Sequence, residues 1–233
     1  MTRPYDDDRV RRGMARQLAE RRALLDDGAG HLGWKAGFGA KQALEEFGTD
    51  GPLVGYLTDR TLLGDGASVS IEGWRNPQIE HEMYVRFGRD LHGGASPDET
   101  RASIDAVGPA FEIVDIHPPP EDVEEILAAN IFHRGVILGD ADPGRAGAGI
   151  DGLRAEITVG GSVHDTPDDL ESGTGRILDT VAWVADTLAD AGLSVRRGDV
   201  LITGSVIPPV PVARGIDVRY RLDPFPPLSV RFL

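Results

Sequence analysis

The pattern of apolar and polar positions in the first fifty residues changes from the period of a helix to that of a strand. Between residues 8 and 26, apolar side chains recur near helical spacing among charges, which predicts an amphipathic helix. Glycines end this pattern, and residues 31–38 predict a short strand. Residues 40–47 predict one or two helical turns, closed by Gly48.

From residue 51 onward, short apolar runs alternate with turns rich in Gly, Pro and Asp. Each run has the length of a strand, and their close spacing predicts a β-rich sandwich or a rolled sheet. The predicted strands are residues 67–71, 79–87, 110–114, 135–138, 153–159, 200–203, 216–222 and 228–232.

Helical patterns interrupt this β-rich region. Residues 97–104 and 120–129 predict short helices, and residues 177–191 carry an apolar stripe at helical spacing that Gly192 terminates. No repeat or low-complexity linker divides the chain. We therefore predict an α+β protein, with a helical region over residues 1–50 packed on one larger domain over residues 51–233.

Charge and composition narrow the classes of partner and chemistry. The formal net charge is −14 and the sequence pI is about 4.8, which argues against nucleic acid and anionic membranes but permits cations. The absence of cysteine excludes disulfides, thiolate metal sites and a cysteine nucleophile. The N-terminus is polar, and no run approaches the roughly 20 apolar residues of a membrane span, so we expect a soluble, cytoplasmic protein.

Two glutamates stand two positions apart in the predicted strand PQIEHEMYVRF. Glu80 and Glu82 point to the same side of a strand, where their charges repel. One interpretation is an exposed polar face. The other is a hard divalent cation, which takes carboxylate oxygens and turns the repulsion into shared attraction. His81 points the opposite way and is expected to be a structural or surface residue, not a ligand.

A third acidic side chain lies in the run AFEIVD. Glu112 stands among apolar residues, and a buried carboxylate needs a cation or hydrogen-bond donors. It is the candidate third ligand, with Asp115 as the next choice.

Two further segments offer groups that would bind an anion. Lys35 stands in GWKAG, between a tryptophan and close glycines, and is either a snorkelling lysine at a strand end or a cation aimed at a substrate. The strand GDVLITGS ends in Thr203, Gly204 and Ser205, which form either an ordinary turn or a set of hydroxyl and N–H donors for a carboxylate.

The order of these motifs resembles the fumarylacetoacetate hydrolase superfamily, in its 2-oxo-pent-4-enoate hydratase and 4-oxalocrotonate decarboxylase branch. The resemblance runs from about residue 33 to the C-terminal VRF and includes GWKAG, PQIEHEMYV, AFEIVD, AAN and WVADTLADAGLSVRRGDVLITGS. It implies a mixed β-roll with peripheral helices. It also implies at least a homodimer, and a complex with a decarboxylase or hydratase partner is conceivable.

The resemblance implies roles for individual residues. Mg²⁺ or Mn²⁺ would be bound by Glu80, Glu82 and Glu112 and would hold the oxygens of a short 2-oxo acid. Lys35 would lie near the metal and assist substrate binding or proton transfer. The implied substrate contacts are Asn130, Thr203, Gly204 and Ser205.

The implied activity is metal-dependent chemistry on a 2-oxo acid through a stabilised enolate. The expected reaction is hydration of a 2-oxo-alkenoate, or decarboxylation, in aromatic-compound catabolism. One alternative is a C–C hydrolase of an acylpyruvate-like compound, which needs a base for water; His31 is a speculative candidate. Another is a non-catalytic keto-acid-binding partner subunit.

One segment departs from the pattern that the resemblance leads us to expect. An aspartate is replaced by Ala129, and small residues are replaced by Ile131 and Phe132. These changes could remove a hydrogen-bond partner and reshape the pocket. His133 could add an acid–base group, although a structural role is the favoured interpretation. The proline run 118–120 is also unusual.

Overall fold

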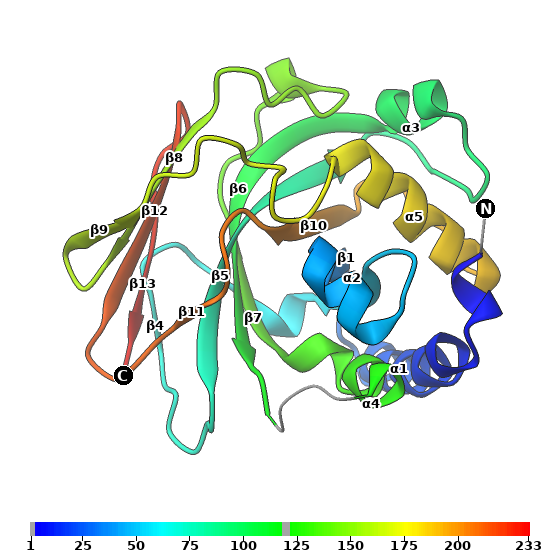
Figure 1. The fold of residues 1–233 in the computed structure, drawn as a ribbon, viewed down its shortest axis with the longest axis horizontal. Helices are drawn as coiled ribbons and strands as arrows, with labels where there is room; N and C mark the ends of the chain where they lie inside the picture. The colour runs from blue at the N-terminus through cyan, green and yellow to red at the C-terminus, as the bar shows by residue number, and fades with distance from the viewer. Residues whose placement is uncertain (1–2, 118–121) are drawn as a thin grey trace.

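The computed structural model describes residues 3–117 and 122–233, in which two β-sheets form the body of the protein (Figure 1). The larger, eight-stranded sheet has the order β2-β1-β10-β5-β6-β7-β3, with β11 paired to β5, and the five-stranded sheet has the order β4-β13-β12-β8-β9. The larger sheet contains β1 (His31–Gly37), β2 (Leu53–Thr58), β3 (Leu62–Leu63), β5 (Pro77–Phe87), β6 (Ile104–Asp115), β7 (His133–Leu138), β10 (Val200–Ser205) and β11 (Val210–Pro211). The smaller sheet contains β4 (Ala67–Val69), β8 (Arg154–Val159), β9 (Ser162–Asp165), β12 (Asp217–Asp223) and β13 (Leu228–Phe232).

Five α-helices lie around the larger sheet in the described residues. Local sequence starts and ends several of them: Asp7 accepts a hydrogen bond from the Arg9 amide at the start of α1, Ser96 caps α3, and Gly48 closes α2 with φ +63°. The helices are α1 (Asp8–Asp26), α2 (Lys41–Phe47), α3 (Pro97–Ser103), α4 (Val123–Ala128) and α5 (Ile177–Asp190). Short 3-10 turns cover Pro4–Asp6, Asp59–Thr61, Asn130–Phe132 and Pro143–Arg145.

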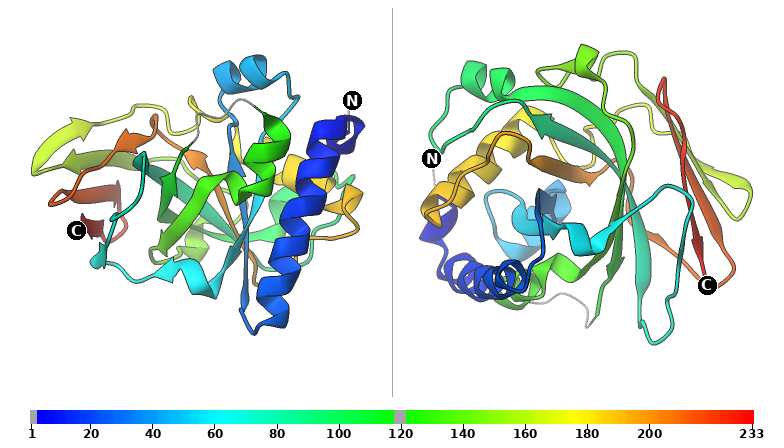
Figure 2. Two further views of the ribbon diagram at one scale, coloured as in Figure 1. Left: turned by 90° about the horizontal axis from the view of Figure 1, so that it is seen from below. Right: turned by 180° about the vertical axis from the view of Figure 1, so that it is seen from behind.

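The larger sheet curls between the smaller sheet and the helices. Figure 1 shows the smaller sheet on the left and α1, α2, α4 and α5 on the right, within the curve of the larger sheet. Figure 2 shows the same curl from behind. Strand β12 alternates exposed and buried positions, so that Val218, Tyr220 and Leu222 pack into the core between the sheets. A second apolar cluster joins α1 to α4, with Met14 and Leu127 at its centre.

The predicted architecture and most predicted elements are confirmed. The α+β class, the rolled sheet and the peripheral helices are all present, and α1 has the predicted bounds. Strand β6 is longer than the predicted 110–114, because Gly108 and Pro109 interrupt its sequence pattern. Strand β2 was not predicted, because all six of its positions are buried and its sequence therefore does not alternate. The prolines at 118–120 lie outside the described residues.

The first fifty residues contribute a strand to the larger sheet. Strand β1 lies between β2 and β10, antiparallel to the first and parallel to the second. The sheet therefore includes residues on both sides of position 50. No helix in the described part of the chain is long and apolar enough to cross a membrane.

Candidate metal centre and active site

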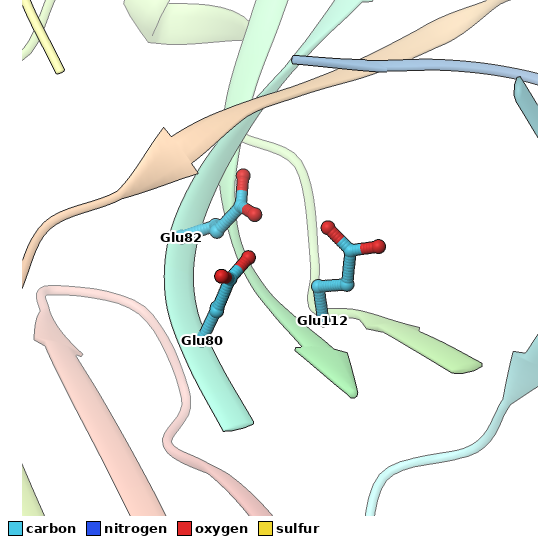
Figure 3. Close-up of side chains that lie close together, drawn as sticks. All are labelled: Glu80, Glu82 and Glu112. Carbon is cyan, nitrogen blue, oxygen red and sulfur yellow. The ribbon is translucent and has the colours of Figure 1, made fainter. Parts of the chain in front are cut away.

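Three glutamates from β5 and β6 lie close together (Figure 3). Glu80 and Glu112 are directly opposite each other in the antiparallel pairing of β5 with β6, and Glu82 follows two positions along β5. One carboxylate oxygen from each lies within 4.8 Å of the others. The predicted ligand set is therefore brought together by strand register.

Burial and mutual repulsion make this cluster electrostatically costly. Burial and the charge of Glu112 raise the pKa of Glu80 to about 8, and the same causes raise the pKa of Glu82. Burial also acts to raise the pKa of Glu112, but Lys35 and His133 outweigh it, so that its pKa is lowered. Two of the three carboxyls therefore favour protonation unless a cation compensates them.

The oxygen atoms fit a hard divalent cation. Glu82 and Glu112 are buried, and each has one oxygen, Oε1 of Glu82 and Oε2 of Glu112, with no hydrogen-bond partner. Buried polar atoms without partners are rare in proteins, and an oxygen-only donor set suits Mg²⁺ or Mn²⁺. Asp115, the next candidate, is not in this cluster, because its carboxylate accepts from the backbone amides of Arg75 and Asn76 at 3.1 and 2.8 Å.

Lys35 reaches the cluster from β1. Its side chain is 1% exposed, and Nζ donates to Oε1 of Glu112 and to the carbonyl oxygen of Ile131 at 3.2 Å. Gly55 leaves room for this lysine, because a Cβ at that position would lie 2.7 Å from Lys35 Cγ. An ammonium has three N–H groups, so one remains for a molecule in the adjacent cavity.

His133 holds Glu112 from the other side. Its Nδ1 lies 2.6 Å from Glu112 Oε1, and its Nε2 lies 2.9 Å from Thr61 Oγ1. Burial lowers the pKa of His133 against the effect of Glu112. A neutral ring therefore donates from Nδ1 to Glu112, and its Nε2 lies beside the Thr61 hydroxyl, which is also 3.2 Å from the Thr58 carbonyl oxygen. The contact between Thr61 and His133 could not be predicted from the sequence, because the two residues are distant in the chain.

The three residues at the end of β10 lie beside the cluster, but their polar groups bind protein atoms. The Gly204 amide donates to Glu82 Oε2 at 2.7 Å and thereby orients that carboxylate. The Thr203 hydroxyl donates to the Met83 carbonyl, and the Ser205 hydroxyl interacts with the backbone of His81. All three line the cavity described below.

Other predicted residues lie apart from the cluster. The Asn130 amide binds the backbone N–H and carbonyl of Tyr56 at 2.9 and 3.0 Å and does not line the cavity. His31 lies against Asp199 and Trp34. His81 points to the opposite side of β5, as predicted, where its buried ring packs edge-on against Phe111 and Tyr220.

A cavity of about 390 Å³ opens beside Glu80 and Lys35. Its volume falls within the usual range for a small-molecule site. Helix α2, the end of β10 and the turn at residues 131–132 form its walls. The cluster and the cavity together provide a carboxylate cage, a lysine and room for a short organic molecule.

Comparison with known proteins assigns the chain to a family. Residues 30–232 match the family described as fumarylacetoacetate (FAA) hydrolase C-terminal. The chain belongs to the fumarylacetoacetate hydrolase family. Its residues 31–233 supply both sheets and every carboxylate of the cluster.

Relatives within the family include hydratases and decarboxylases. The chain is 30% identical to 2-hydroxyhexa-2,4-dienoate hydratase of Comamonas testosteroni, over 79% of this chain and 71% of that one. It is 25% identical to a 4-oxalocrotonate decarboxylase of Pseudomonas sp, over 92% and 85%. The structure of 4-oxalocrotonate decarboxylase from Pseudomonas putida G7, complexed with magnesium and adipate, matches with a TM-score of 0.86 at 27% identity, covering 93% of this chain and 83% of that one.

Proposed function

We propose that this protein is a divalent-metal-dependent enzyme that binds a short 2-oxo acid and stabilises its enolate. The proposed reaction is hydration of a 2-oxo-alkenoate or decarboxylation of a related acid, in aromatic-compound catabolism. The observation that carries the proposal is the convergence of Glu80, Glu82 and Glu112, of which Glu80 lines the cavity. The names of the hydratase and decarboxylase relatives support the same chemistry.

The proposed cofactor is Mg²⁺ or Mn²⁺, held by the three glutamates. Bound there, it would supply positive charge that favours the enolate of a 2-oxo acid. The chain's own residues set the geometry: the Gly204 amide fixes Glu82, and Lys35 with His133 fixes Glu112.

Lys35 is the proposed proton-transfer residue. It lines the cavity, and its remaining N–H can hydrogen-bond to a carboxylate or carbonyl oxygen of the acid. From the same position, Nζ can deliver a proton to carbon as the enolate collapses, or take one back. The end of β10 closes one side of the site and restricts where the acid can lie.

The C–C hydrolase alternative receives less support from the site. Such an enzyme needs a base placed to activate water. None of the described histidines lines the cavity, and His31 lies against Asp199 instead. The non-catalytic alternative rested on Ala129, which ends α4 and does not line the cavity. The activity of Ala129→Asp would test whether the residue at this position affects catalysis.

The proposal is tested first by thermal unfolding of protein stripped with EDTA. We expect Mg²⁺ or Mn²⁺ at 100 times its Kd to stabilise the fold by about 2.7 kcal/mol, which corresponds to roughly 5–10 °C in Tm. Oxalate, a mimic of the enolate, should raise Tm further only when metal is present. Glu82→Gln should abolish both shifts.

A matched control and direct assays complete this test. Glu45→Gln removes an exposed glutamate of α2 and should leave both shifts intact. Loss of the dienol absorbance of a 2-hydroxy-2,4-dienoate reports hydration, and CO₂ release reports decarboxylation. Stripped protein that responds to neither metal nor oxalate would contradict the proposal. A homo-oligomer is also proposed and would be seen by light scattering; the cytoplasmic location stays a prediction.

A further inference from the structure

One wall of the cavity contains an unusual concentration of left-handed backbone. Five non-glycine residues of the described chain have positive φ, and Phe38, Ile131 and Phe132 among them line the cavity, with φ of 56, 53 and 59°. Such angles are sparsely populated, above all for a β-branched residue such as Ile131, and they persist only where the surroundings enforce them. This strain fixes three large apolar side chains in one wall.

Neighbouring contacts enforce this backbone. Asn130, which also has positive φ, is held by its two hydrogen bonds to the Tyr56 backbone. The ring of Phe38 packs edge-on against Phe47 of α2, at 5.4 Å between ring centres and an angle of 87°. These contacts hold Phe38 and the turn at residues 130–132 in place in the wall.

The charges around the cavity are unfavourable for a second carboxylate. Among the described residues that line it, Lys35 is the only lysine or arginine, and Glu112 already engages this lysine. The other charged residues of the lining are Glu80 and, at the rim, Glu46.

We propose that the wall formed by Phe38, Phe47, Ile131, Phe132, Ile116 and Ile207 selects a 2-oxo acid with an uncharged, apolar tail and rejects one with a terminal carboxylate. This inference rests on the proposed function, since it assumes that the 2-oxo group lies at the glutamates. A tail that extends toward the wall gains from burial of each methylene. A carboxylate at the same position would lose water and find no cation. The preferred reaction is accordingly hydration of a monocarboxylic 2-oxo-alkenoate.

The test compares two unreactive acids of equal length on the Mg²⁺-loaded protein. 2-Oxohexanoate ends in a methyl group and 2-oxoadipate ends in a carboxylate, and their dissociation constants are measured by titration calorimetry. We expect 2-oxohexanoate to bind at least tenfold more tightly. We also expect affinity to rise about threefold to fourfold per methylene from 2-oxobutanoate to 2-oxohexanoate. Equal affinities, or a preference for 2-oxoadipate, would overturn the inference.

Substitutions check the electrostatic cause. Gln42 lines the cavity from the exposed side of α2, so Gln42→Arg adds a cation at low risk to folding and should narrow the difference between the two acids. Val163→Arg, at a 62% exposed position of the smaller sheet, adds the same charge elsewhere and should leave the difference unchanged. An equal effect of both substitutions would mean that net charge, and not the wall, sets the preference.

Oxalate separates failure of this inference from failure of the proposed function. It carries no tail and should bind the metal-loaded protein whatever the wall selects. If oxalate does not bind, the proposed function fails. If oxalate binds and 2-oxoadipate matches 2-oxohexanoate, the metal site stands and only the selection by the wall is wrong.

Discussion

Lys35 and Glu112 form an ion pair in which each side chain is 1% exposed, although the two residues lie on strands separated by β10 and β5 in the sheet order. Figure 2 shows the curl of the larger sheet, to which both strands belong. A buried pair of this kind leaves a costly charge when one partner is removed. It also places an ammonium beside the carboxylate cluster, where an anionic acid would bind.

Removing the charge of Lys35 should separate metal binding from catalysis. For Lys35→Met we expect kcat to fall by about 10²–10⁴, the range for a missing proton-transfer group. The Mg²⁺ affinity should not weaken, because the substitution makes the site more negative. Calorimetric Mg²⁺ titration and steady-state kinetics measure the two effects. Lys41→Met, which removes an exposed lysine of α2, serves as the matched control and should retain full activity.

His133 should act through Glu112 on metal affinity. Hydrogen-bond partners of metal ligands typically contribute 10–100-fold to affinity, so we expect His133→Ala to raise the Kd for Mg²⁺ by that factor. His133→Asn keeps a donor near the position of Nδ1 and should recover part of the loss. Thr61→Val removes the hydroxyl that contacts Nε2, at 2.9 Å in the native protein, and should give a smaller loss. Unchanged Mg²⁺ affinity in His133→Ala would show that this contact is dispensable.

Asn130 should affect the stability of the wall more than the binding of the 2-oxo group. Asn130→Ala removes two hydrogen bonds to Tyr56 and places alanine at φ 49°, so we expect a loss of roughly 2–3 kcal/mol in the free energy of unfolding. Chemical denaturation measures this loss. Oxalate should bind the folded, metal-loaded variant with near-native affinity. If the variant keeps native stability but loses oxalate binding, Asn130 contacts the acid directly, as the family resemblance implied.

His81 should make the metal-free protein sensitive to acid. Burial, with a smaller effect of His164, lowers its pKa to about 3 in the folded state, whereas an unfolded histidine has a pKa of about 6.5. The unfolded state therefore binds the extra proton first, and stability is lost as the pH falls below about 6.5. The loss from this residue should reach about 2 kcal/mol at pH 5 relative to pH 8.

The substitution His81→Phe isolates this contribution. The raised pKa values of Glu80 and Glu82 act in the opposite direction, but they are common to both proteins and largely cancel in the difference. We expect the variant to gain about 2 kcal/mol over the native protein between pH 8 and pH 5, measured by urea unfolding of EDTA-treated samples. A difference that does not change with pH would show that His81 does not titrate in this range.

Local sequence was sufficient for elements whose pattern is carried by neighbouring residues. Helix α1 was predicted with its observed bounds, because its apolar spacing and the glycines that follow it are both local signals. Strand β2 was missed because a strand buried at every position shows no alternation. The left-handed turn at residues 130–132 also could not be predicted locally, because isoleucine and phenylalanine do not favour positive φ.

The sequence by itself determined that Glu80 and Glu82 share one face of a strand, because the side-chain period of a strand is two. It also excluded thiolate ligands for a metal, since the chain has no cysteine. Only the tertiary structure decided that Glu112 stands opposite Glu80, that Lys35 and His133 both contact Glu112, and that Phe38 and Phe132 line the same cavity. These relationships depend on strand register and sheet curl, which arise from contacts between residues distant in the chain.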